Sequence, residues 1–144
     1  MYDHILLPTD GSAEMAPVID HAVELAAHHG ADIHALYVLD TASFGTLPME
    51  TSADAITSML EDEGRTAMES IEEKAEDVTV ERTLLDGSPS PNIVDYAEKN
   101  DIDVIVMGTH GRGGIDRLLL GSVAERVVRT SDVPVLTVRV GETD

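Results

Sequence analysis

The sequence predicts a single α/β domain in which a parallel β-sheet is covered by helices on both faces. Two observations support this. Strand and helix patterns alternate along the whole chain, and the segment 104–107 (Val-Ile-Val-Met) is apolar on both faces. Alternating strands and helices form right-handed crossovers, and a strand without polar alternation belongs at the centre of a parallel sheet. The 144 residues suit one domain, which we place at 1–144.

Each element follows from a local pattern. We expect strands at 4–8, 32–39, 78–85, 103–107 and 134–140, and helices at 12–29, 53–76, 88–99 and over 123–130. Gly30 ends the first helix, and Pro17 predicts an irregular or kinked start to it. Ser88 and Pro89 open the third helix as its cap and its first residue.

Helical spacing in the second helix predicts a buried stripe, which Gly64 weakens slightly. The expected stripe is Ile56, Met59, Leu60, Ala67 and Ile71. The segment 40–51, which contains the single phenylalanine, Phe44, is either a lid over a ligand or a plain surface connection.

The composition limits the chemistry. Apolar residues make up 42% of the chain and aromatic residues only 3%, so the core is aliphatic. Without cysteine there is no disulfide and no thiolate chemistry. The chain opens on strand-like residues and has no long apolar run, so we expect no signal peptide, no membrane span and a cytoplasmic location.

The net charge of −19, from 28 acidic and 9 basic residues, repels nucleic acid. It has two interpretations, an acidic surface for a partner protein or adaptation to a salt-rich, halophilic cytoplasm. We favour the second, because the acids are spread along the chain and only Lys74 and Lys99 are lysines.

The segment Gly108–Ser122 carries the strongest functional signal. Glycines at 108, 111, 113, 114 and 121 leave backbone N–H groups uncovered between a strand and a helix. Free N–H groups and the positive end of a helix dipole together favour phosphate. Arg112 and Arg117 add positive charge within this loop.

A second polar loop, Pro8-Thr9-Asp10-Gly11-Ser12, follows the first strand. Ligands of open parallel sheets bind beyond the carboxyl ends of the strands, where the strand order reverses. If the first and fourth strands are neighbours, both loops meet in one crevice. The glycine pattern is neither a P-loop, nor a dinucleotide fingerprint, nor a nucleophile elbow.

The spacing Gly108-x-x-Gly111, nine residues, then Gly121-Ser122 resembles the nucleotide motif of the universal stress protein family, in its ATP-binding branch. The resemblance covers the whole chain. It includes the Pro-Thr-Asp-Gly-Ser turn, the run from Asp103 to Gly111, the Leu-Leu-Leu-Gly-Ser-Val-Ala-Glu-Arg-Val segment and the closing Val133-Pro134-Val135-Leu136.

This resemblance implies a five-stranded sheet in the order 3-2-1-4-5, an adenine-nucleotide alpha-hydrolase-like fold, with ATP across the crevice and often a divalent ion, Mg²⁺ or Mn²⁺. It also implies a homodimer through the fifth strand, at 133–140, whose valine-rich edge invites pairing. By motif position, the adenine and ribose side is lined by Pro8, Thr9, Asp10 and Val38; the ribose and α-phosphate by Met107 and Gly108; and the phosphates by Gly111, Gly121, Ser122 and Val123.

Structural roles compete at several of these positions. Asp10 can cap the first helix, and Ser122 with Glu125 forms a capping box for the fourth. Val38 and Met107 are core residues under any interpretation. His4, His21 and His34 show no ligand spacing, so we expect no zinc site.

Three functions remain open at this point. The chain is a nucleotide-binding sensor, a slow ATPase, or an interaction module without ligand. No residue resembles a dedicated water-positioning base, so binding ranks above catalysis. The intact glycine spacing argues against the interaction module.

Overall fold

The structure is a computed structural model that describes residues 2–11, 13–39, 53–110 and 118–140. Five strands form one sheet in the order β3-β2-β1-β4-β5, and every adjacent pair is parallel. The strands are β1 (His4–Pro8), β2 (Asp32–Leu39), β3 (Val80–Asp86), β4 (Val104–His110) and β5 (Val135–Val140). The helices are α1 (Ala16–His29), α2 (Ala53–Lys74), α3 (Pro89–Lys99) and α4 (Leu118–Thr130), with a 3₁₀ turn, η1 (Ala13–Met15), before α1. The predicted fold class and strand order are confirmed.

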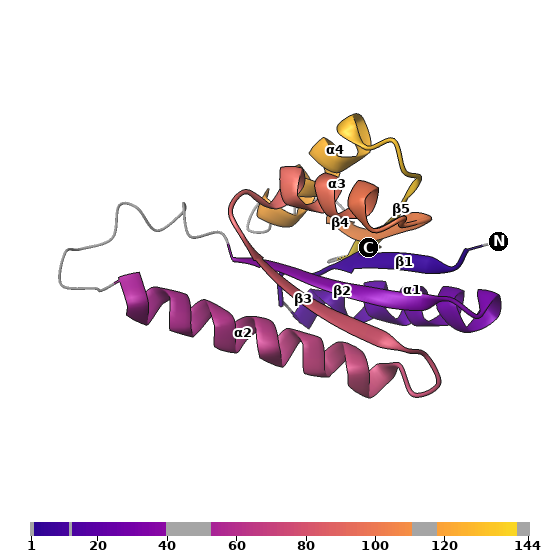
Figure 1. The fold of residues 1–144 in the computed structure, drawn as a ribbon, viewed down its shortest axis with the longest axis horizontal. Helices are drawn as coiled ribbons and strands as arrows, with labels where there is room; N and C mark the ends of the chain where they lie inside the picture. The colour runs from indigo at the N-terminus through magenta and orange to yellow at the C-terminus, as the bar shows by residue number, and fades with distance from the viewer. Residues whose placement is uncertain (1, 12, 40–52, 111–117, 141–144) are drawn as a thin grey trace.

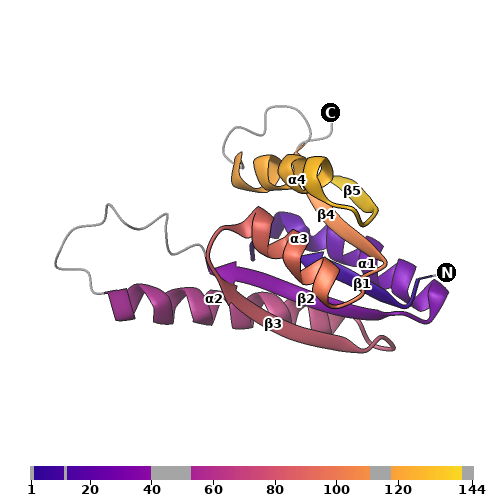
Figure 2. The same ribbon diagram turned by 45° about the horizontal axis from the view of Figure 1, so that its top comes forward.

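Helices cover both faces of the sheet, with α1 and α2 on one side and α3 and α4 on the other (Figures 1 and 2). Residues of β1 alternate between two buried clusters. Ile5 and Leu7 pack on the α1 and α2 side, whereas Leu6 packs on the α3 and α4 side. This alternation is the period-2 pattern of a strand buried on both faces. Within the part of the chain that the structure describes, no helix is both long and apolar enough to cross a bilayer.

The irregular start of the first helix is confirmed. The chain makes the 3₁₀ turn η1 before α1, and Pro17 lies in the first turn of α1, where its missing N–H costs no helical hydrogen bond. At the other end, Gly30 adopts a left-handed conformation with φ 68°, and its N–H donates to the carbonyl of Ala26.

Gly64 has a packing role that the propensity argument missed. A Cβ at this position would lie 2.6 Å from Cδ2 of Leu84 and 3.1 Å from Cδ1 of Tyr37. Glycine therefore lets α2 lie close against β2 and β3, which offsets its poor helix propensity.

The buried stripe of α2 is confirmed at Ala67 and Ile71, but Met59 is 50% exposed, so its expected burial is wrong. The exposure of Met59 follows from its place in α2, since the first turns of this helix extend past the strands that the rest of the helix covers (Figure 1). Met68 instead is fully buried. The side chains of Ile56 and Leu60, and the whole of the segment 40–51 with Phe44, lie outside the described residues.

One capping prediction is confirmed and one needs correction. Ser88 is the N-cap of α3 and Pro89 its first residue, as predicted; the Ser88 hydroxyl makes no capping bond, and the Asn92 side chain instead donates to the Ser88 carbonyl at 2.8 Å. Helix α4 begins at Leu118, so Ser122 lies inside it and the predicted capping box with Glu125 is wrong. Leucine is a good helix former, and the three leucines at 118–120 extend the helix towards its amino end.

Candidate functional site

Strands β1 and β4 lie side by side at the centre of the sheet, which is the condition for the two polar loops to meet in one crevice. Ile5 pairs with Val104, and Leu6 pairs with Ile105. After β1 the chain passes to α1 on one face, and after β4 it passes to α4 on the other (Figure 1). The carboxyl ends of these two strands are therefore the topological switch point, where open parallel sheets bind ligands.

Short hydrogen bonds hold the turn after β1. The Thr9 N–H donates to the carbonyl of Leu36 at 2.9 Å, and the Gly11 N–H donates to Oγ1 of Thr9 at 3.0 Å. Gly11 has φ +79°, a left-handed backbone conformation that residues with a side chain rarely adopt. This turn presents Asp10 half-buried at the carboxyl edge of the sheet. The N-cap of α1 is Met15, at the end of the 3₁₀ turn η1, so Asp10 does not occupy that position.

Apolar side chains form the floor beneath the carboxyl end of β4. Met107 and Val123 are 2% and 8% exposed and belong to one buried cluster, against which Val38 packs half-buried. Pro8 is also buried, at the end of β1. Gly108 is buried opposite Val138 of β5. The core role of Met107 is confirmed.

Helix α4 starts one turn earlier than expected, which changes which amides are free. The first amides of a helix have no partner within it, and in α4 these belong to residues 118–120. Gly121 and Ser122 follow them inside the helix. Gly111 lies outside the described residues, as do Arg112 and Arg117.

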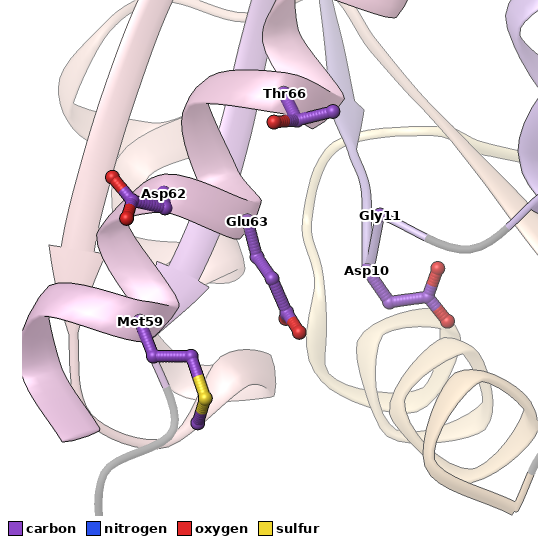
Figure 3. A pocket seen from close by; sticks show the side chains of 6 residues that line it. All are labelled: Asp10, Gly11, Met59, Asp62, Glu63 and Thr66. Carbon is purple, nitrogen blue, oxygen red and sulfur yellow. The ribbon is translucent and has the colours of Figure 1, made fainter.

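A hollow of about 520 Å³ opens between the β1 turn and α2, and Figure 3 shows it from close by. It is lined by Asp10, Gly11, Met59, Asp62, Glu63 and Thr66. The side chain of Glu63 extends from α2 towards the turn, and the carboxylate of Asp10 points away from it (Figure 3). Carboxylate side chains of α2 line this hollow, and their negative charge disfavours a phosphate there.

Tyr37 supports both the turn and the hollow. Its hydroxyl donates to Oε1 of Glu63 at 3.0 Å, and a Cβ at Gly11 would lie 3.6 Å from its ring. Burial raises the pKa of Tyr37, and the hydrogen bond to Glu63 and the negative charges of Glu63 and Asp10 raise it further. A neutral tyrosine is therefore a fixed donor at the edge of the site.

Sequence reasoning missed one polar contact away from this site. Nδ1 of His4 lies 3.3 Å from Nε2 of His34, although the two residues are 30 positions apart. The available signal was that each histidine alternates with apolar residues in a predicted strand, so both side chains point into a helix-covered face of the sheet. Among the described residues, no three histidine, aspartate, glutamate or cysteine side chains come together to hold a metal ion.

Comparison with known proteins gives the family. The sequence model of the "Universal stress protein family" matches residues 1–139. The chain belongs to the universal stress protein family. A curated member from Methanocaldococcus jannaschii, universal stress protein MJ0531, is 41% identical over 141 residues, which cover 96% of this chain and 83% of that protein.

Solved structures show the same fold. The structure of MJ0577, also a universal stress protein of M. jannaschii, has a TM-score of 0.82 at 31% identity, covering 99% of both chains. A universal stress protein in complex with cAMP has a TM-score of 0.75 at 23% identity, covering 97% of this chain and 99% of that one. One from Archaeoglobus fulgidus in complex with dAMP has a TM-score of 0.68 at 23% identity, covering 97% and 98%.

Proposed function

We propose that this universal stress protein binds an adenine nucleotide, ATP with a divalent cation, at the carboxyl ends of β1 and β4, and acts as a nucleotide-dependent regulator of a stress response. One observation carries the proposal. The two polar loops are far apart in sequence, but they follow neighbouring parallel strands and so leave the sheet at the same end. The family members solved with cAMP and dAMP support adenine as the base.

The ligand roles follow motif position and burial. Pro8, Thr9, Asp10 and Val38 line the adenine and ribose side, and Met107 and Gly108 flank the ribose and the α-phosphate. Since Pro8 and Met107 are buried, they meet the ligand through backbone groups and the edges of their side chains. Gly108 gives the closest approach, because a buried position without a side chain leaves room for a ribose.

The phosphates are assigned to Gly111, Gly121, Ser122 and Val123, with the amides of the first turn of α4 beside them. That turn carries the positive end of the helix dipole, which stabilises phosphate. The phosphates themselves are the principal ligands of the cation in this proposal. The cation supplies positive charge that offsets the three carboxylates around the neighbouring hollow.

We rank binding above hydrolysis for this protein. Phosphoryl transfer requires an in-line water, a base that positions it and stabilisation of the transition-state charge. In this proposal Asp10 lies on the ribose side and is not assigned as that base. ATP occupancy then acts by changing the loops around the crevice and with them the surface offered to a partner.

The same proposal includes a dimer and a salt-rich cytoplasm. Strand β5 is one edge of the sheet, and residues 133–140 supply the pairing surface between two copies. The charge of −19 suits a concentrated salt solution, in which screening acts over a few ångströms.

The decisive experiment separates the functions by what the protein carries and binds. Purified protein is denatured, and the supernatant is analysed by anion exchange; calorimetry then measures ATP, ADP, AMP and cAMP with and without Mg²⁺. We expect bound ATP, and weaker association at low salt unless Mg²⁺ is present, because the protein and the ligand are both negative. ADP alone in the supernatant supports hydrolysis. An empty supernatant with no calorimetric signal contradicts nucleotide binding.

A matched pair of variants tests the assignment of α4. Gly121→Val places a branched side chain next to the proposed phosphates and should abolish ATP binding. Glu125→Val adds the same side chain one turn further along α4, where the native side chain is 71% exposed, and should leave binding unchanged. Circular dichroism confirms that both variants fold. ATP affinity retained by Gly121→Val rules out the phosphate site at this turn.

A further inference from the structure

We propose that His4, His34, Tyr96 and Thr83 form a proton-responsive latch that ties α3 to the sheet and loosens when both histidines are protonated. Nδ1 of His4 lies 3.3 Å from Nε2 of His34, and Nδ1 of His34 lies 2.8 Å from the hydroxyl of Tyr96. That hydroxyl is 3.4 Å from Oγ1 of Thr83. We call these four residues the histidine latch. The proposal does not rest on nucleotide binding.

The histidine latch is partly buried and lies away from the crevice. His34 is only 5% exposed, and His4 is half-buried at the first residue of β1. The rings of His34 and Tyr96 meet edge to face, with centroids 5.7 Å apart. Four elements, β1, β2, β3 and α3, each contribute one side chain. Because His4 and His34 lie in the amino-terminal parts of their strands, they face the end of the sheet opposite the proposed nucleotide.

When both rings are neutral, the hydrogen bonds of the histidine latch can run in either of two directions. In one, His34 donates to His4 and accepts from Tyr96. In the other, His4 donates to His34, which donates from Nδ1 to Tyr96, and Tyr96 donates to Thr83. Protonation of His4 selects the second direction and breaks no bond, because a cationic ring donates from both nitrogens.

A second proton cannot be accommodated in the same way. With both rings cationic, Nδ1–H of His4 faces Nε2–H of His34, so two donors and two positive charges meet in a partly buried site. Tyr96 retains a bond from His34, but the contact between the two strands' histidines is lost. Separation of the rings moves His34 against Tyr96 and loosens α3.

The charged groups around His34 oppose one another. Burial lowers the pKa of His34, and the nearby His4 lowers it further, whereas Glu81 on β3 and Asp32 on β2 raise it; the net direction is downward. From the segment before β4, the carboxylate of Asp103 accepts the backbone N–H of His4 at 2.9 Å. Because the pKa of His34 is lowered, the state in which both rings are cationic arises only under acid conditions.

Histidine ¹⁵N spectra across a pH titration test the hydrogen bonds of the histidine latch directly. While His4 is cationic and His34 is neutral, His34 should carry its proton on Nδ1. The variant His4→Gln keeps a hydrogen-bonding partner and removes the positive charge, so the titration midpoint of His34 should move to higher pH. The control His21→Gln changes an exposed histidine of α1 and should leave that midpoint unchanged. A His34 midpoint that is the same in all three proteins overturns the proposal.

Hydrogen exchange tests whether the latch holds α3. Between about pH 7 and about pH 5, amide exchange in α3, corrected for intrinsic rates and compared with α1, should become about tenfold faster in the wild type and change less in His4→Gln. Tyr96→Phe should show fast exchange in α3 at both pH values. If His4→Gln folds poorly, His4→Asn serves the same purpose. Equal acid sensitivity of α1 and α3 in the wild type contradicts the latch.

Discussion

The hydroxyl of Tyr37 donates a 3.0 Å hydrogen bond to the carboxylate of Glu63, and this bond joins β2 to α2 beside the turn that carries Asp10. Tyr37 is 5% exposed, and its ring also lies under Gly64 and against Gly11. One side chain therefore positions both the long helix and the turn of the proposed nucleotide site.

The hydrogen bond predicts a loss of stability at high pH. The pKa of Tyr37 is raised above the ordinary tyrosine value, so the folded state holds a proton that the unfolded chain releases. This contribution is complete below about pH 10 and is lost as the pH rises towards the folded pKa. Urea unfolding of wild type and Tyr37→Phe should differ by about 1 kcal/mol at neutral pH and converge above about pH 10. Tyr2→Phe is the control, and a constant gap across the range contradicts the prediction.

Replacing Gly64 by alanine should destabilise the protein although alanine is the better helix former. The added Cβ would lie 2.6 Å from the movable end of Leu84, but 3.1 Å from the fixed ring of Tyr37. The propensity gain of about 1 kcal/mol opposes an overpacking cost of about 1–3 kcal/mol. We expect a net loss of about 1 kcal/mol in urea unfolding. The exposed Ser70→Ala on the same helix should instead be neutral or stabilising.

Asp103 should stabilise the fold only above acid pH. Its Oδ2 accepts the backbone N–H groups of Asp3 at 2.8 Å and of His4 at 2.9 Å, which lower the pKa of Asp103. This stabilisation is present above the ordinary aspartate value of about 3.9 and disappears as the pH falls through the lower folded pKa. Asp103→Ala should cost about 1–2 kcal/mol at neutral pH.

The neutral variant Asp103→Asn provides the comparison, because its carbonyl can accept the same two bonds without a charge. It should lose less stability than Asp103→Ala. If the difference between wild type and Asp103→Ala persists unchanged to the lowest pH at which the protein folds, the carboxylate is not the cause.

Pairing of β5 between two copies should be sensitive to proline at the free edge. Ile105 is in register with Val135 and donates to the carbonyl of Pro134, so the backbone groups of the exposed residue Thr137 point away from β4. Thr137→Pro removes an outward donor and leaves the β4 ladder intact. Ultracentrifugation should show a dimer for the wild type and for Thr137→Ala, and a monomer for Thr137→Pro. A wild-type monomer at micromolar concentration contradicts the proposed dimer.

The charge of −19 predicts that stability rises with salt. Thermal unfolding followed from low to molar KCl should give a continuously increasing Tm, because screening shortens to about 3 Å at about 1 M salt. A Tm that does not respond to KCl favours the other interpretation, in which the acids form a surface for a partner.

Local signals predicted β2 fully, with the bounds Asp32–Leu39. Gly30 ends the preceding helix, and the strand residues are apolar on both faces. The pairing of β1 with β4, which the resemblance to the universal stress protein family implied, is also confirmed. The bounds of β1 (His4–Pro8) and α3 (Pro89–Lys99) are also as predicted. The remaining elements differ from the expected bounds by one or a few residues, where a helix or strand end has no strong local signal.

Tertiary packing decided what local patterns could not. Met59 fits the helical stripe of α2, yet whether it is buried depends on where the sheet beneath it ends. No local pattern around Gly64 reveals that Leu84 and Tyr37 pack against it. Ser122 has the composition of a cap, but the leucines before it extend the helix. The contact between His4 and His34 depends on the register of two strands, which one sequence does not specify.

Strand β2 serves two different layers with alternate residues. His34, Leu36 and Val38 face α3 and α4, whereas Ile33, Ala35 and Tyr37 face α1 and α2. Deletion of a single residue within β2 would exchange the two sets, sending the imidazole into the aliphatic layer and the phenol away from Glu63. Length changes among relatives that keep this fold must therefore fall in the connections, where they do not change which residues of the strand face each layer.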